Sequence, residues 1–150
     1  MKYGEKMKTI ALRFGEHFAP ECGTISAHQR IIDDVGFVWY GKLGSAVSTK
    51  IVNTLMNTDD KKILLINSGK ADRYWAHVIA VSYEVPPLEE FPEYYHDLAA
   101  KMKTWFKIDC FDLAEKSVMS KCVVSSSGAS LSEASKHSMS PYFIIEYEEA

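Results

Sequence analysis

The fold of this chain is decided by one stretch of sequence, Gly36-Phe37-Val38-Trp39-Tyr40-Gly41-Lys42. Its central residues favour the pleated, half-buried surface of a β-strand, and the flanking glycines allow the backbone to turn sharply at both ends. Because side chains alternate between the two faces of a strand, Trp39 and Tyr40 must point in opposite directions. We therefore predict a strand in which one ring anchors the core and the other faces a cleft or the outside. The alternative is that both rings fill the core.

The composition is that of an ordinary globular domain, with 47% hydrophobic and 25% charged residues in a chain of 150. A chain of this length is most simply a single domain over residues 1–150. Its net charge of −3 argues against binding nucleic acid by overall positive charge, although a local basic rim remains possible. The three cysteines are widely spaced and no membrane-length apolar run occurs, so the sequence predicts a reduced, cytoplasmic protein with no membrane partner.

Hydrophobic periodicity predicts six or seven strands with short helices between some of them. The predicted strands cover residues 7–14, 37–42, 63–66, 74–83, 105–111 and 142–147, with a weaker candidate at 122–124. Helices are predicted after the capping residues Ser26, Ser48 and Ser130, and another after Pro92. Strands outnumber helices and no regular βαβ alternation occurs, which argues against a doubly wound sheet. We predict an α+β, mainly β fold, a small and partly open barrel decorated with short helices.

Strict alternation also assigns faces within two of these strands. In the strand at 74–83 it places Trp75, His77 and Val81 on one face. In the strand at 105–111 it places Cys110 on the same face as Ile108. His77 is interpreted as a half-buried, hydrogen-bonded histidine rather than a catalytic base.

Few motifs in the sequence indicate catalytic, phosphate-binding or metal-binding chemistry. The segment 67–70 ends like a phosphate-binding loop, but Leu64 and Ala71 occupy positions where that motif needs glycine and Ser or Thr, so a hairpin turn is the better interpretation. His17 and Cys22 have no second pair at zinc-like spacing. No nucleophile or metalloprotease signature occurs. The sequence therefore predicts no metal site, no cofactor and no evident catalytic residue.

The run His28-Gln29-Arg30-Ile31-Ile32 leading into residues 36–42 resembles the PUA-like superfamily, in particular the EVE-type and restriction-associated modified-base-binding domains. The segments 63–68 and 74–83, and the Ser-rich loop and helix before 142–145, extend this resemblance over most of the chain. Such domains are small β-barrels that bind RNA or DNA, and several hold a flipped, modified base in an aromatic cage. The resemblance implies that Trp39 and Tyr40 lie at or near a base pocket, with Lys42 and Ser68 as polar neighbours.

The first functional hypothesis is a non-enzymatic domain that binds RNA or DNA and holds a base, modified or flipped, in an aromatic pocket. Its predicted ligand-binding residues are Trp39, Tyr40, Lys42, Ser68 and Trp75. A reader of this kind should carry a local positive rim, for which Lys42, Lys70 and Arg73 are the candidates. The alternatives are an enzyme for a small molecule or nucleotide metabolite on the same barrel, and a protein-interaction module. These would show a convergent titratable pair or a flat apolar patch instead.

Overall fold

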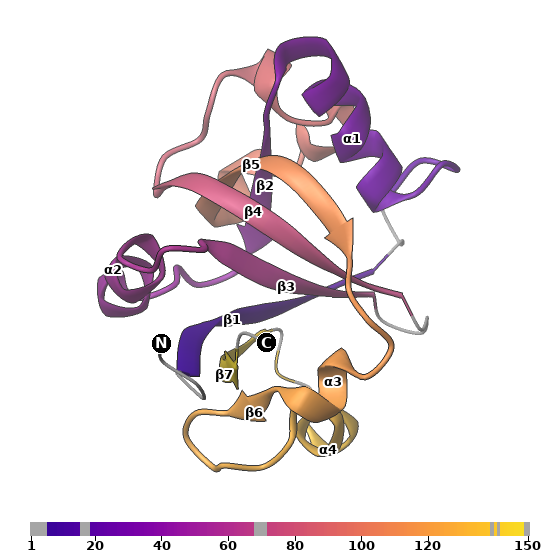
Figure 1. Cartoon of the computed structure of the whole chain (residues 1–150). Coiled ribbons are helices and arrows are strands. Elements are labelled where there is room, and N and C mark those ends of the chain that lie inside the picture. The colour runs from indigo at the N-terminus through magenta and orange to yellow at the C-terminus, as the bar shows by residue number, and fades with distance from the viewer. Residues whose placement is uncertain (1–5, 16–18, 68–71, 139, 141, 149–150) are drawn as a thin grey trace.

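The computed structural model describes residues 6–15, 19–67, 72–138, 140 and 142–148, and they form one curled, seven-stranded sheet with short helices on both of its faces (Figure 1). The strands are β1 (Lys6–Phe14), β2 (Val38–Leu43), β3 (Lys62–Asn67), β4 (Arg73–Ser82), β5 (Met102–Leu113), β6 (Val123–Val124) and β7 (Tyr142–Glu148). The α-helices are α1 (Thr24–Val35), α2 (Thr49–Met56), α3 (Val118–Lys121) and α4 (Leu131–His137). Three 3₁₀ turns precede β5, namely η1 (Leu88–Glu90), η2 (Glu93–Tyr95) and η3 (Ala99–Lys101).

The sheet runs in the order β2-β5-β4-β3-β1-β7-β6. The pairing of β1 with β3 is parallel, and the other strand pairs described are antiparallel. This arrangement is a curled half-barrel, which confirms the predicted mainly β, partly open barrel with helical decoration. The predicted strands at 37–42, 63–66 and 74–83 share one sheet, in which β5 lies between β2 and β4.

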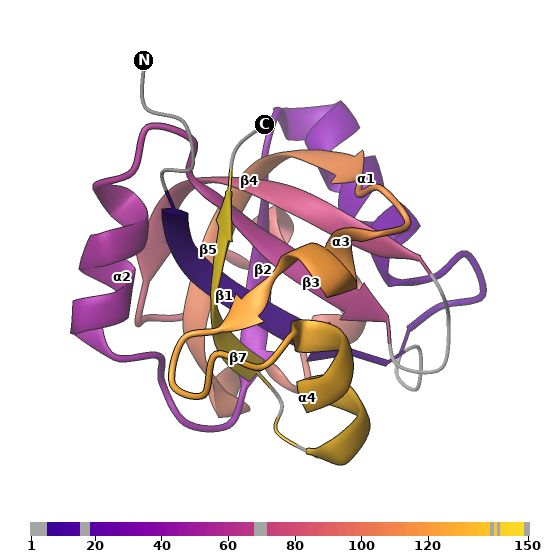
Figure 2. The same ribbon diagram turned by 60° about the horizontal axis from the view of Figure 1, so that its bottom comes forward.

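Apolar residues on the two faces of the sheet form separate clusters. The first face packs side chains such as Leu12, Val38 and Phe106 against α1 and α2. On the second face, Leu64 and Ile145 belong to a cluster that also contains residues of α3, β6 and α4 (Figure 2). The central strand β3 supplies residues to both clusters, which confirms the interpretation of its continuous apolar run as a strand covered on both sides.

Two of the three predicted serine caps are confirmed. The Ser48 side chain accepts a hydrogen bond from Ile51 N at 3.3 Å, and that of Ser130 accepts one from Glu133 N at 3.2 Å. The predicted cap at Ser26 is wrong, because α1 begins at Thr24 after Gly23 without a side-chain cap. At its other end, α1 stops at Gly36, which is in the left-handed conformation with φ of 91°.

The predicted helix after Pro92 is also wrong. The segment consists of η2 and η3 instead, and Met102 already pairs with Leu43 as part of β5. Tyr95 stays buried nonetheless, because it packs into a third cluster with Phe91 and Trp105 beneath β2 and β5. Short turns allow this segment to follow the edge strand β2, since Tyr95 contacts both Tyr40 and Trp105.

Two β-bulges between β4 and β5 change the predicted faces. His77 pairs with Cys110 and Val78 pairs with Ile108, so Asp109 is an extra residue in β5. Ile79 is likewise an extra residue in β4, because Ala80 pairs with Lys107. Each bulge reverses the alternation that follows it. Cys110 therefore lies on the face opposite Ile108 and beside His77, and Val81 joins the first-face cluster, both contrary to the predicted faces.

The helices described are short. The longest, α1, has 12 residues, and no helix in the described part of the chain is both long and apolar enough to cross a membrane.

Candidate ligand-binding cavity

A cavity of about 290 Å³ lies between the end of β1, the edge strand β2 and the segment that carries η2 and η3. Alternation along β2 turns Val38, Tyr40 and Lys42 toward the first face of the sheet, and the last two of these line the cavity. The first residue of α1 and the aromatic residues around η2 complete the walls. The lining residues that give the cavity its chemical character are Tyr40, Lys42, Thr24, Tyr94, Tyr95 and Leu98.

Lys42 brings a cation into this largely apolar space, with only 6% of its surface exposed. Its Nζ donates hydrogen bonds to Leu43 O at 3.2 Å and to Ser45 O at 2.8 Å, and it lies 4.8 Å from the centre of the Tyr142 ring. Desolvation lowers the pKa of Lys42 below its ordinary value. An ammonium group has three N–H donors, and two are used by these carbonyls. The arrangement can thus offer a donor to a ligand acceptor while its position is fixed by the backbone.

The aromatic wall is held in place by its own contacts. The Tyr95 ring lies edge-on to those of His28, Tyr40 and Trp105, with centres 5.1, 6.4 and 6.1 Å away. Burial raises the pKa of Tyr95 well above its ordinary value, so it stays a neutral phenol. The Tyr94 and Tyr95 rings lie edge-on to each other with centres 4.8 Å apart. These contacts fix the rings before any ligand arrives.

His28 lies behind the tyrosines and is completely buried. Its ring centre is 5.1 Å from those of Tyr40 and Tyr95, and its Nδ1 donates to Thr24 O at 2.8 Å. Its Nε2 has no hydrogen-bond partner among the described residues. Burial lowers the pKa of His28 from 6.5 to about 4, although the bond to Thr24 opposes the shift. At neutral pH the ring is therefore an uncharged imidazole that packs as one more aromatic residue.

The structure brings Tyr40 and Lys42 together and separates them from Trp39 and Trp75. Trp39 points to the opposite face of β2, where it packs against the third cluster and its Nε1 donates to Glu90 Oε1 at 3.1 Å. Trp75 lies on the second face of the sheet, with its ring centre 5.0 Å from that of Tyr147. Neither tryptophan lines the cavity. Ser68 lies outside the described residues.

The positive charge at the cavity also differs from the predicted rim. Lys42 is buried in the wall rather than exposed beside it, Arg73 is half-buried in β4, and Lys70 lies outside the described residues. Arg13 at the end of β1, which the sequence had not indicated, also contributes to the lining, but its guanidinium points to the second face of the sheet. Its Nη2 donates to Ser135 O at 2.7 Å and to Ser138 O at 2.8 Å, which fixes the guanidinium against α4.

Sequence reasoning also missed Tyr94, Tyr95 and the supporting His28 as members of this site. The available signal was the pair of adjacent tyrosines, which the sequence placed in a helix on account of the preceding proline. Their role depends on the way the turns wrap around β2, a tertiary feature with no local signature.

Comparison with known proteins places this architecture in a family. A family model described as PUA-like matches residues 10–144, which extend from β1 to β7 and include the whole cavity. No curated protein and no solved structure matches the chain. Because the matched residues make up most of the chain, and because the half-barrel is the architecture that the resemblance implies, the chain belongs to the PUA-like family.

Proposed function

We propose that this domain binds RNA and holds one unpaired base in the cavity between Tyr40, Tyr94 and Lys42. PUA-like domains generally bind RNA or other nucleic acids. The observation that carries the more specific proposal is the cavity itself, in which tyrosine rings and a fixed cation line one small space.

The size of the cavity favours a single base over a larger ligand. Its volume of about 290 Å³ lies just below the roughly 300–1,000 Å³ that is usual for small-molecule sites. A flat heterocycle fits such a space, whereas a whole nucleotide cofactor needs more room. A base can enter it only when it is unpaired or flipped out of a duplex.

The walls supply the two kinds of contact that a base requires. Stacking on an aromatic ring contributes about 1–3 kcal/mol per base, and the cavity offers the rings of Tyr40 and Tyr94. Lys42 offers an N–H donor to a base carbonyl or ring nitrogen, and a hydrogen bond from a charged donor contributes about 1.5–3 kcal/mol. The resemblance to EVE-type domains supports extending the proposal to a modified base, since a pocket of fixed shape can discriminate an added group.

A cavity-filling substitution tests the proposal. Leu98 is a half-buried residue of the lining, so the larger ring of Leu98→Trp should occupy the cavity. RNA affinity should then fall about tenfold or more, because the base loses at least one stacking contact. Leu88→Trp makes the same replacement at a position that is 55% exposed and lies outside the cavity, and it should bind as the wild type does. Affinity is measured by fluorescence anisotropy with single-stranded RNA and with DNA of the same sequence. Equal RNA binding by Leu98→Trp and the wild type would refute the cavity as the base site.

Lys42→Met tests the polar contact, because methionine approximates the length of the lysine stem without its charge. We expect a loss of about 10- to 100-fold in RNA affinity, the equivalent of one charged hydrogen bond. Binding by the wild type should weaken only shallowly with salt, since few phosphates are neutralised by a chain of net charge −3. A steep salt dependence would instead indicate an extended basic track outside the cavity. If the DNA oligonucleotide binds more tightly than the RNA, the ligand is DNA and the cavity remains its binding site.

A further inference from the structure

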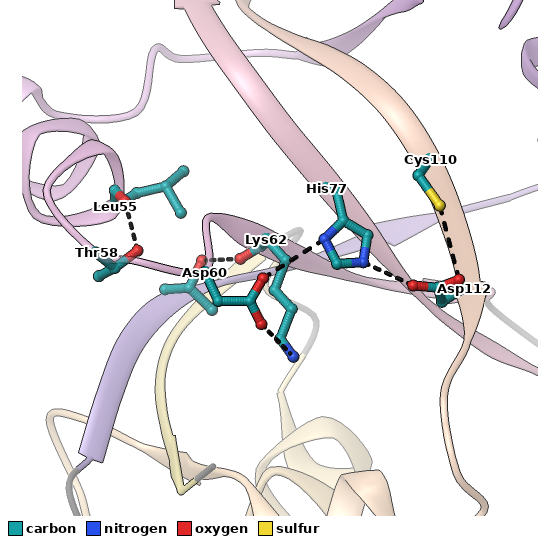
Figure 3. Close-up of polar contacts among 8 residues, drawn as sticks. Leu55, Thr58, Asp60, Lys62, His77, Cys110 and Asp112 are labelled. Atoms are coloured by element: carbon teal, nitrogen blue, oxygen red, sulfur yellow. Dashed lines mark hydrogen bonds and ion pairs between the residues drawn. The ribbon is translucent and has the colours of Figure 1, made fainter.

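We propose that His77, Cys110 and Asp112 form a binding site for a divalent transition-metal ion, most suitably Zn²⁺, on the face of the sheet away from the base cavity. Their three ligand atoms, one nitrogen, one sulfur and one oxygen, lie within 4.8 Å of one another. Figure 3 shows the three side chains converging from the neighbouring strands β4 and β5. This site is independent of the proposed RNA-binding function.

The bulge at Asp109 creates the cluster. His77 and Cys110 are directly paired across β4 and β5, and Trp75 is paired with Asp112. Directly opposite residues in antiparallel strands share a face, and so do residues two apart in one strand. Without the extra residue, Cys110 would share the core-facing side of Ile108. With it, the thiol, the imidazole and the carboxylate share one exposed surface.

The three ligand atoms lie within 4.8 Å of one another, a wider set than a tetrahedral site, and Asp112 approaches His77 and Cys110 through different carboxylate oxygens. With Zn–N, Zn–O and Zn–S bonds of about 2.0–2.3 Å, tetrahedral ligand atoms lie roughly 3.3–3.6 Å apart. The distance from Cys110 Sγ to Asp112 Oδ1 is 3.7 Å. The distance from His77 Nε2 to Asp112 Oδ2 is 2.7 Å, a hydrogen bond that must open by about half an ångström to admit the metal. All three side chains are partly or well exposed, so small χ rotations can make these adjustments.

A second carboxylate lies near the other ring nitrogen of the histidine. Asp60 Oδ1 lies 3.6 Å from His77 Nδ1, and Asp60 Oδ2 is paired with Lys62 Nζ at 3.1 Å. A carboxylate on the far nitrogen of a ligating histidine fixes its tautomer and its ring orientation, as is usual around protein-bound zinc. The metal would bind Nε2, and Asp60 would accept from Nδ1–H.

The donor set selects the kind of metal. A thiolate and an imidazole favour Zn²⁺ over Mg²⁺ or Ca²⁺, which prefer oxygen ligands alone. Three protein ligands leave a fourth position for water, and the hollow lined by His77, Cys110 and Asp109 gives solvent access to it.

The test is direct titration of the reduced, chelator-treated protein with Zn²⁺ in competition with a chromophoric chelator. We expect one ion per chain, and an affinity that falls about 100-fold or more in Cys110→Ser and in His77→Gln. Cys22→Ser is the matched control, because Cys22 is the other cysteine that is not fully buried, and this variant should bind as the wild type does. Zn²⁺ should raise the melting temperature of the wild type and of Cys22→Ser but not of Cys110→Ser.

Co²⁺ gives a spectroscopic test of the ligands themselves. The wild type should show a thiolate-to-cobalt charge-transfer band in the near ultraviolet that is absent from Cys110→Ser. Asp60→Asn should retain this band while its Zn²⁺ affinity falls about 10- to 100-fold, as expected of a residue that only positions His77. The proposal is overturned if the wild type binds neither ion, or if Cys110→Ser and His77→Gln bind Zn²⁺ as tightly as the wild type.

Discussion

Mild acid should destabilise this protein through one residue, His28, which is buried as a neutral imidazole among Tyr40, Tyr94, Tyr95 and Phe111. Its Nδ1 already donates to a backbone carbonyl, so a proton added at Nε2 would place a charge in an apolar space. The titratable groups in ring contact with it are tyrosines, which remain neutral at acid pH and cannot compensate that charge. Protonation is therefore far easier in the unfolded chain than in the folded one.

The size of the effect follows from the pKa of His28, which falls from 6.5 in the unfolded chain to about 4 in the fold. One pKa unit corresponds to about 1.4 kcal/mol, so the full difference is about 3 kcal/mol. Because the folded-state pKa is the lower one, the unfolded state binds more protons between these two values. The stabilisation is complete above 6.5 and is lost as the pH falls toward 4. By about pH 5 roughly 2 kcal/mol should already be gone.

The assay is urea unfolding at a series of pH values for the wild type and for His28→Phe, which retains an aromatic ring of similar size. Between about pH 7.5 and pH 5, the free energy of unfolding of the wild type should fall by about 2 kcal/mol more than that of His28→Phe. His137→Phe is the matched control, because the His137 side chain is 78% exposed, and its profile should follow that of the wild type. Parallel profiles for wild type and His28→Phe over this range would refute the burial of His28 as a neutral ring.

Three further substitutions test other parts of the structure. Gly41→Ala should lower the free energy of unfolding by about 1–3 kcal/mol in urea titrations, because its Cβ would overlap Met102 Sδ and meet Trp105 Cζ3 at 3.0 Å. An unchanged midpoint would show that Met102 can move aside. Trp39→Ala should cost about 2 kcal/mol with RNA affinity unchanged, because Trp39 faces away from the cavity. Lost affinity at constant melting temperature would instead return Trp39 to the ligand site. Ser48→Ala should destabilise the protein by about 1 kcal/mol, measured by thermal unfolding, through loss of the α2 cap; no change would mean that the cap is dispensable.

The features that the sequence predicted well are those set by short-range physics. The continuous apolar run of β3 requires cover on both faces wherever the strand lies, and the capping serines before α2 and α4 bond backbone groups only three residues away. The alternation in β2 likewise predicts that Trp39 and Tyr40 separate, and the structure places them on opposite faces. What alternation could not decide is which ring faces a cavity, because that depends on the segment opposite each face.

The cavity shows why the candidate site was only partly predictable. Tyr40 and Lys42 lie on one strand face and could be identified from the spacing of two residues. Tyr94 comes from a segment far along the chain, which reaches the cavity by wrapping around the edge strand. Trp75 was a candidate because of its residue type alone, and its strand position places it against Tyr147 on the other face. Residue type identifies the side chains that could bind a base, whereas only the topology decides which of them meet.

The bulge at Asp109 changes which side chains meet on each face of the sheet, although the local sequence still favours a strand. A residue with an unremarkable strand neighbourhood shifts the register between His77 and Val78, and every side chain beyond it on β5 changes face. Phe111 turns inward to the ring cluster around His28, while Cys110 turns outward to His77. One inserted residue thus completes the packing behind the candidate ligand-binding cavity and assembles the proposed metal site on the opposite face. Periodicity within a single strand cannot reveal such a bulge, since the register belongs to the pair of strands.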